Sequence, residues 1–357
     1  MVNFQIRSRS LAALTVAGVG FLFPAITISA QSAPDASVQS GVQMNLSGVD
    51  RQAVSEVTSL KHHAKPAITG AAKTRHSELS NLHSAVAVSA INLSSATVYP
   101  GDLSFHGGKM VEYAESHPIY LFSTSAKCTT ISCWGNPATF LQNLAASQLI
   151  HIVDQYTNNS APNRYTLGSS FHHSIGPSSK TAPLTDKDMA AYAHAAAKSS
   201  GSGYGHIYHI FLPPGQDVCF SATGGVCYSP DNPATFSFCA YHGSADFSDV
   251  GHVLYTVEPF QNVSGCRLQP GTPNGELIDS TVSVLSHETV ETITDPDGTG
   301  WWNSTDDALD GQEIADECSY ILASTGSFDA PSFAIGAKHY AVQREYDNTR
   351  HACTEAP

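Results

Sequence analysis

Apolar residues recur in short runs from about residue 105 to the end of the chain, and their spacing predicts both strands and helices. Residues 118–123, PIYLFS, have the length and composition of a buried strand. Residues 206–212, HIYHIFL, alternate and are rich in aromatic and β-branched side chains, as strands are. The pattern also predicts strands or extended segments at Tyr165–Ile175, Phe236–His242, Val253–Phe260, Ser332–Ile335 and His339–Gln343.

Four segments carry helix signals instead. They are residues 136–156, 186–198, about 275–294 and 313–319. Thr185 and Asp188 form a T-x-x-D start signal for the second helix. Pro296 and Gly298 stop the third helix. Helices and strands interleave without strict β-α-β regularity, so we expect an α/β or α+β fold with one mixed-sheet domain over residues 105–357.

Two N-terminal segments precede this domain. Arg7 and Arg9 come before an apolar run at residues 11–28, which is the pattern of a secretory signal peptide over residues 1–30. A membrane anchor is the alternative, and glycine and proline within the run disfavour it. Residues 31–104 are rich in Ser, Ala and Val, and they predict a low-complexity linker or a pro-segment. We therefore expect a secreted protein that is extracellular, periplasmic or associated with a cell wall.

Charge narrows the set of partners. The 357-residue chain has 17 Lys and Arg against 31 Asp and Glu, which gives a net charge of −14, and no basic block stands out. A nucleic-acid partner is therefore not expected. The acidic balance also disfavours binding of the mature chain to anionic membranes.

The cysteine count indicates disulfide bonds. The eight cysteines are Cys128, Cys133, Cys219, Cys227, Cys239, Cys266, Cys318 and Cys353. An even number in an exported chain predicts up to four disulfides, but eight cysteines allow about 105 pairings. Short loops favour Cys128–Cys133 and Cys219–Cys227, and Cys239–Cys266 and Cys318–Cys353 would then be left.

The strongest chemical pattern is H-E-x-x-E in the third predicted helix, formed by His287, Glu288 and Glu291. Helical residues four apart lie on one face, so His287 and Glu291 would point the same way. The pattern resembles the H-E-x-x-H of zinc hydrolases, in which the outer residues bind metal and the inner Glu moves protons. It predicts a zincin-like helix with His287 and Glu291 as metal ligands and Glu288 as the catalytic base.

A metal site needs a third ligand, and acidic residues downstream are the candidates. Glu313 and Asp316 lie three apart on the predicted short helix, where their carboxylates would share a face. We expect Glu313 to be the ligand and Asp316 to be an alternative ligand or a hydrogen-bond acceptor for the ligand histidine. Asp295, two turns from His287, and Asp297, ten residues after it, are further alternatives.

The ligand set limits the chemistry. One histidine and two carboxylates would neutralise a divalent cation, so a metal-bound water would be acidified less than with neutral ligands. We expect one divalent metal, preferably zinc, although the set also suits a harder cation or a structural site. A solvated acidic helix face is the alternative. The other candidates for a cleft, each expected to have an ordinary partner, are His206, His209, His242 and His252.

The residues after this helix carry a family resemblance. The runs HETVETITDP, GWW, EIADEC and KHYAVQREYDNTRHAC resemble the C-terminal half of phosphate-induced, EXORDIUM-like secreted proteins, and HGG at 106–108 and CAYHG at 239–243 also fit. The resemblance covers roughly residues 105–357. It implies export and, from plant members, association with the cell wall. Bacterial relatives that look like metallopeptidases imply the metal-site roles given above, and the matching C-terminal cysteines imply a Cys318–Cys353 pair.

Two functions are therefore expected. The first is a secreted metal-dependent hydrolase, most readily a zinc-dependent metallopeptidase, in which Glu288 activates a metal-bound water and the substrate is a peptide or a cell-wall component. The second is a non-catalytic extracellular or cell-wall-associated protein whose acidic cluster binds a structural cation.

Overall fold

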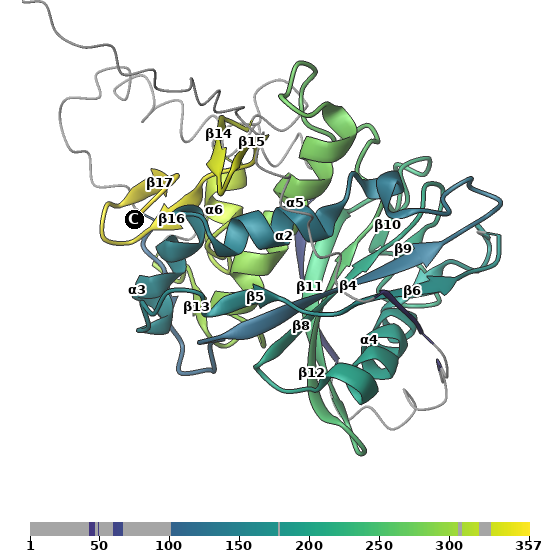
Figure 1. Ribbon diagram of the computed structural model, residues 1–357, viewed down its shortest axis with the longest axis horizontal. Helices are drawn as coiled ribbons and strands as arrows, with labels where there is room; N and C mark the ends of the chain where they lie inside the picture. The colour runs from purple at the N-terminus through teal and green to yellow at the C-terminus, as the bar shows by residue number, and fades with distance from the viewer. Residues whose placement is uncertain are drawn as a thin grey trace, which may run out of the picture. The chain divides into compact units, whose positions relative to one another are not determined.

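The computed structural model describes residues 43–46, 49, 60–66, 101–177, 179–305, 309–320 and 330–357. These residues belong to one compact unit, Ser40–Pro357 (Figure 1). The predicted signal peptide lies outside the described residues. No helix among the described residues is long and apolar enough to cross a membrane.

The unit is built around an eight-stranded sheet with the order β1-β6-β4-β8-β12-β11-β2, and β5 pairs with β4. The strands are β1 (Gln43–Asn45), β2 (Leu60–Pro66), β4 (Ala114–Phe122), β5 (Tyr165–Leu167), β6 (Ser170–Ser174), β8 (His206–Phe211), β11 (Phe238–Phe247) and β12 (Gly251–Glu258). Pairing is parallel from β1 to β12, whereas β11 is antiparallel to both β12 and β2. This confirms the predicted single domain with a mixed sheet.

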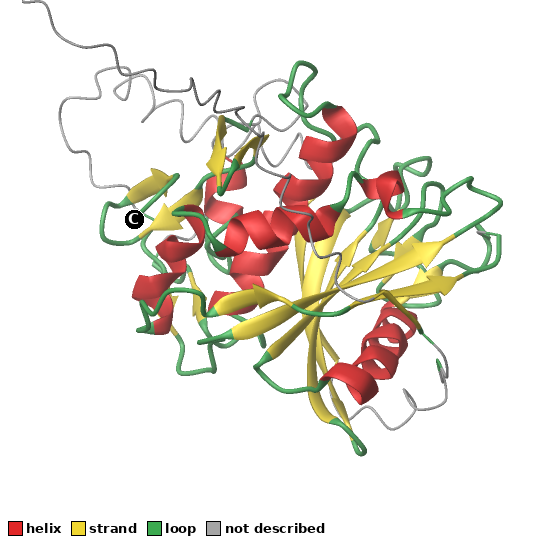
Figure 2. Cartoon of the chain, in the orientation of Figure 1, coloured by secondary structure: helices red, strands yellow, loops and turns green. Residues whose placement is uncertain are grey.

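Helices cover both faces of this sheet (Figure 2). They are α2 (Pro137–Ala145), α3 (Asp154–Thr157), α4 (Asp186–Ser200), α5 (Glu276–Thr294) and α6 (Asp316–Tyr320). Successive strand residues point to opposite faces. Thus Ile119 and Tyr208 pack with α4 in one core, and Tyr120 and Phe211 pack with α2 and α5 in the other.

The predicted helix over 136–156 is wrong as one continuous element. The chain forms α2, then a 3-10 turn at Leu149–Val153, then α3. Ser147 explains the break, because its hydroxyl donates to the Leu144 carbonyl at 2.7 Å and accepts from the Ile150 N–H at 3.4 Å. Such local side-chain bonds compete with the helical ladder. By contrast, the T-x-x-D signal of α4 is a true capping box formed by Thr185 and Asp188.

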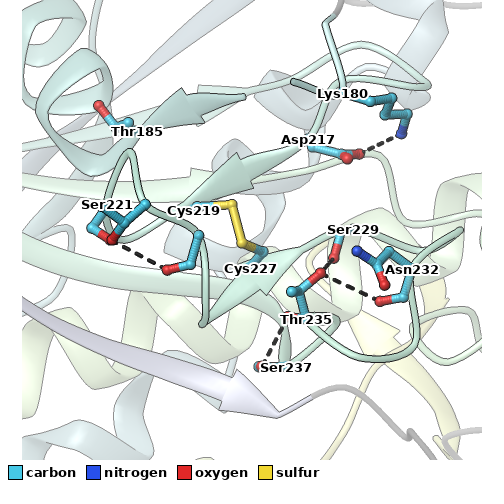
Figure 3. The surroundings of a disulfide bond; sticks show 12 residues. Lys180, Thr185, Asp217, Cys219, Ser221, Cys227, Ser229, Asn232, Thr235 and Ser237 are labelled. Atoms are coloured by element: carbon cyan, nitrogen blue, oxygen red, sulfur yellow. Dashed lines mark hydrogen bonds and ion pairs between the residues drawn. A yellow bond between two sulfur atoms is a disulfide. The ribbon is translucent and has the colours of Figure 1, made fainter. Parts of the chain in front are cut away.

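Four disulfides join the cysteines. Two are the short-loop pairs, Cys128–Cys133 and Cys219–Cys227, and the other two join the remaining cysteines as Cys239–Cys266 and Cys318–Cys353. Such a set is typical of exported proteins. Figure 3 shows Cys219–Cys227 joining β9 (Val218–Cys219) to β10 (Cys227–Tyr228).

The remaining short strands are β3 (Ser104–Phe105), β7 (Leu184–Thr185), β13 (Trp301–Trp302), β14 (Ser332–Ile335), β15 (Lys338–Ala341), β16 (Glu345–Asp347) and β17 (Ala352–Thr354).

Two strands come from the region expected to be a linker or pro-segment. β1 pairs with β6 in parallel, and β2 pairs with β11 in antiparallel register. They form the two ends of the strand order. Some of residues 31–104 therefore extend the same sheet.

Candidate metal centre

Helix α5 carries the H-E-x-x-E residues and is held at both ends by aspartates. At the start, the Asp279 carboxylate accepts hydrogen bonds from the Asn274 and Ala341 backbone N–H groups at 2.7 and 3.2 Å. After the last turn, the Asp295 carboxylate accepts from the backbone N–H groups of Thr299 and Gly300, each at 2.6 Å. A side chain at Gly300 would begin 2.2 Å from the Thr294 carbonyl oxygen, so only glycine fits this turn. The helix is thus fixed at both ends of the candidate site.

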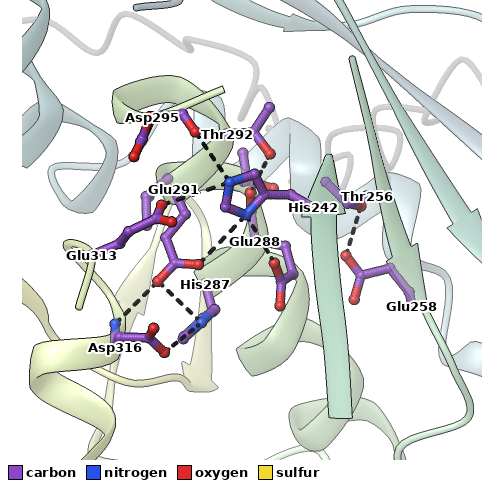
Figure 4. A network of polar contacts seen from close by, with 12 residues as sticks. His242, Thr256, Glu258, His287, Glu288, Glu291, Thr292, Asp295, Glu313 and Asp316 are labelled. Carbon is purple, nitrogen blue, oxygen red and sulfur yellow. Dashed lines mark hydrogen bonds and ion pairs between the residues drawn. The ribbon is translucent and has the colours of Figure 1, made fainter. Parts of the chain in front are cut away.

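His287, Glu291 and Asp316 form one group with metal-ligand spacing (Figure 4). The His287 Nε2 lies 3.2 Å from Glu291 Oε1 and 3.5 Å from Asp316 Oδ1. The Asp316 backbone N–H also donates to Glu291 Oε1 at 3.1 Å, which connects the start of α6 to α5. His287 and Glu291 therefore share a helix face as the spacing predicted.

The orientation of the His287 ring is set by Gln343. The Gln343 amide donates from Nε2 to the Ala315 carbonyl at 2.8 Å, so its Oε1 faces His287 Nδ1 at 3.1 Å as an acceptor. Nδ1 therefore carries a proton, and Nε2 is the ring nitrogen turned toward the two carboxylates. A histidine that donates its other N–H to an oxygen is the usual form of a metal ligand.

A second group contains a histidine from the sheet. His242 on β11, together with Glu288 and Glu291, has ligand atoms within 4.8 Å of one another. His242 Nε2 lies 3.2 Å from the Asp295 carbonyl, and Nδ1 lies 3.3 Å from Glu288 Oε2 and 3.6 Å from Glu291 Oε2. Since a carbonyl can only accept, Nε2 carries a proton and Nδ1 faces the glutamates. We expected His242 to have an ordinary partner. Its local signal is that it follows Tyr241, which faces the opposite core, so His242 points toward α5.

Glu313 belongs to neither of these groups. Its Oε2 is 3.6 Å from His242 Nε2, and it precedes α6. The predicted helix over 313–319 is therefore wrong at its start, and Glu313 and Asp316 do not share a helix face. Burial, followed by the charges of Glu291 and Asp295, raises the pKa of Glu313 well above its ordinary range.

The two further alternatives have other partners. Burial raises the pKa of Asp295 to about 6, although the Gly300 and Thr299 N–H groups act in the opposite direction. Burial disfavours the charged form of Asp297, but hydrogen bonds from His252, Ser244 and Tyr204 outweigh it and lower its pKa below the usual range. Ser244 donates to Asp297 at 2.6 Å and Tyr204 at 2.5 Å. Neither aspartate belongs to the metal-compatible groups found among the described residues.

Burial and like charge make a cation a chemically suitable occupant. His242, His287, Glu288 and Glu291 are at most 1% exposed, and Asp316 is 9% exposed. Carboxylates placed this close in a dry interior must share protons or cations to remain stable. Because Glu291 belongs to both groups, a single ion would use one group, and two ions would share its carboxylate. The buried residues can thus hold a metal ion, and the donor set of imidazole nitrogen and carboxylate oxygen suits zinc or manganese.

Comparisons with protein-family models, with curated proteins and with solved structures gave no match to this chain. The function must therefore be inferred from the side-chain geometry.

Proposed function

We propose that this protein is a metal-dependent hydrolase whose ion is held by His287, Glu291 and Asp316. The orientation of His287 carries the proposal. Gln343 fixes its Nδ1–H, so Nε2 points at two carboxylate oxygens 3.2 and 3.5 Å away. A lone pair facing two anions is repulsive unless a proton or a metal ion lies between them. Of the two acids that the sequence left open, Asp316 is the better ligand because it shares this group.

Glu288 is the proposed catalytic base. It neighbours the ligand His287 on α5, and its Oε2 lies 3.3 Å from His242 Nδ1, a group with which it can share a proton. A bound divalent cation would supply Lewis-acid chemistry and lower the pKa of water. Glu288 would then accept a proton from this water. His242, whose Nδ1 faces Glu288, would share that proton and stabilise the protonated glutamate.

The proposed substrate is a peptide or a cell-wall component, and the proposed location is outside the cytoplasm. Support comes from the four disulfides. The likeness to EXORDIUM-like secreted proteins, which is densest from residue 277 onward, points the same way. We propose zinc as the first cation to test, with manganese next because two of the three ligands are carboxylates.

A specific observation favours a second function, in which the cation is structural and no reaction is catalysed. The residues of both groups are at most 9% exposed, whereas a catalytic metal needs a position open to substrate. A structural ion would instead link α5 to the start of α6 through Glu291 and Asp316. This is the non-catalytic extracellular protein expected as the alternative.

Metal content tests whether the site binds an ion. We would purify the secreted protein without chelators and measure metals by mass spectrometry in wild type, His287→Ala and His339→Ala. His339 is an exposed histidine and is the matched control. We expect at least one equivalent in wild type and His339→Ala, and one equivalent less in His287→Ala. Equal metal content in all three proteins would contradict the proposed ligands.

Glu288→Gln distinguishes the two functions once metal is found. We expect this variant to keep its metal and to lose activity on a peptide pool by roughly 100-fold or more, as general-base removal does. Full activity in Glu288→Gln would rule out the catalytic role. A metal-loaded wild type that cleaves no peptide or cell-wall preparation would support the structural cation instead.

A further inference from the structure

A second cluster of metal-ligating side chains lies at the beginning of β4 and β8. Glu115 is paired with His206 across the two parallel strands, and His117 is two residues further along β4. Residues two apart on a strand share a face, and paired residues do so too. Glu115, His117 and His206 therefore project from the same face of the sheet.

The three ligand atoms have the spacing of one coordination sphere. His117 Nε2 lies 3.1 Å from His206 Nδ1 and 3.6 Å from Glu115 Oε2, and His206 Nδ1 lies 4.0 Å from the same oxygen. A tetrahedral zinc ion with ligands at about 2.0–2.1 Å separates them by roughly 3.3 Å. Small side-chain adjustments would bring all three atoms to that distance.

Hydrogen bonding sets up one of the two imidazoles. His117 Nδ1 donates to the Ser169 carbonyl at 3.0 Å, so its Nε2 presents a lone pair to the cluster. His206 Nδ1 can donate to that lone pair when no metal is present. If the His206 proton moves to Nε2, both lone pairs converge on the point that an ion would occupy.

Two glycines make room for the rings. A Cβ at Gly168 would lie 2.3 Å from His117 Cε1, and a Cβ at Gly201 would lie 2.4 Å from His206 Nε2. His117 also stacks on Tyr208 with ring centroids 5.0 Å apart. The rings are thus held in place by close packing, which is what a preorganised site requires.

The cluster is open on one side. His117 is buried, whereas the Glu115 side chain is 53% exposed. Glu115 and His206 line a cavity of about 750 Å³ together with Glu112, Arg164 and Tyr204. An ion at the cluster would therefore have a coordination position that water or a small anionic ligand could reach from the cavity.

We propose that Glu115, His117 and His206 form a second transition-metal site, with two imidazole nitrogens, one carboxylate oxygen and an open position toward the cavity. Zinc and cobalt are the expected ions, because a set rich in imidazole disfavours magnesium and calcium. The site shares no residue with the centre at α5. It therefore stands whether or not the proposed hydrolase is correct.

The site is tested by cobalt titration of the full mature protein after metal removal. Visible absorption monitors the binding. The titration uses wild type, His206→Ala and Glu115→Gln. The matched control is Glu112→Gln, a carboxylate on the same cavity wall that is not in the cluster. We expect His206→Ala to lose one equivalent and Glu115→Gln to bind that equivalent at least 10-fold more weakly. Glu112→Gln should behave as wild type.

The His287→Ala background separates the two centres. There, one cobalt equivalent should remain and should disappear when His206→Ala is added. Retention of that equivalent in the double variant, or equal affinity in Glu115→Gln and wild type, would overturn the second site. Because Glu115 is exposed, Glu115→Gln keeps the proposal testable even if His206→Ala fails to fold, and circular dichroism would establish folding.

Discussion

At the scale of single residues, the α5 centre depends on which nitrogen of each imidazole carries a proton. An oxygen acceptor fixes this for both rings: the Gln343 amide for His287 and the Asp295 carbonyl for His242. In each case the other nitrogen is turned toward glutamates of α5. Neutral partners that lie outside the ligand set therefore control what the ligand atoms can bind.

Replacing Gln343 tests this control. Gln343→Leu removes the acceptor for His287 Nδ1, so the ring should lose its orientation and metal affinity should fall by roughly 10- to 100-fold. Competition with a chromophoric chelator would measure the affinity. Gln148→Leu changes an exposed glutamine in the same way and should leave the affinity unchanged. If Gln343→Leu also binds as wild type, His287 does not bind the ion through Nε2.

At the scale of elements, α5 is unusual because a buried helix carries many polar residues. Hydroxyl groups bond to carbonyls one turn back, as in Thr289 to Leu285 and Thr292 to Glu288, each at 2.6 Å. These bonds satisfy polar side chains without a partner from another element. The helix can therefore lie against β11 and β12 and still present charged residues to His242.

The strand β11 is fixed by the Cys239–Cys266 disulfide, three residues before His242. Replacing both cysteines by serine opens a loop with a sequence separation of 27. The unfolding free energy should fall by roughly 3.5 kcal/mol. The measurement is denaturant unfolding, with metal titration in parallel. Metal affinity should fall as well, because β11 positions His242, whose Nδ1 lies 3.6 Å from the proposed ligand Glu291.

The Cys128–Cys133 pair gives the matched control. Its separation of 5 predicts a smaller loss, roughly 2 kcal/mol. Neither cysteine lies on β11 or belongs to the metal-compatible groups among the described residues, so metal affinity should be unchanged. A larger loss from this pair than from Cys239–Cys266 would contradict the role assigned to the longer loop.

At the scale of the whole molecule, buried histidines link stability to pH. His209 is fully buried between β4 and β12, and its Nδ1 donates to Thr256 Oγ1 at 3.0 Å. Thr256 in turn donates to Glu258 at 2.8 Å, so the hydroxyl is an acceptor for the ring. Burial, with a smaller contribution from His117, lowers the pKa of His209 to about 3. The folded protein therefore favours neutral His209.

The sign of the pH effect follows from this lowered pKa. Above pH about 6.5, the pKa of histidine in the unfolded chain, His209 is neutral in both states and does not lower the free energy of unfolding. As pH falls below about 6.5 toward the pKa of the folded state, the unfolded chain binds a proton that the folded protein does not, and stability is lost. Between pH 7 and 5 the loss from His209 should be about 2 kcal/mol. His209→Asn, which keeps a donor near the Nδ1 position, should show a smaller loss in denaturant unfolding, and His339→Asn should match wild type. Equal pH dependence in all three proteins would refute this linkage.

Much of the fold followed from local patterns. The alternation over 206–212, the T-x-x-D signal before α4 and the α5 pattern each depend on neighbouring residues, and the structure has these elements within a few residues of the predicted bounds. The prediction of one helix over 136–156 was wrong because Ser147 forms hydrogen bonds with the local backbone, an effect that apolar periodicity does not report. The predicted start of α6 was wrong because two acids three residues apart, Glu313 and Asp316, are compatible with a helix and with a bend equally well.

The shared helix face of His287 and Glu291 follows from their spacing alone, because a period of 3.6 residues is a local property. The sequence also favoured the four disulfide pairs. By contrast, the contact of His242 with Glu288 and the grouping of Asp316, not Glu313, with His287 arise from the packing of distant segments. Tertiary packing likewise brings Glu115, His117 and His206 together. These contacts join segments tens of residues apart through the packing of α5 on β11 and the register of β4 with β8, and no local period encodes such distances.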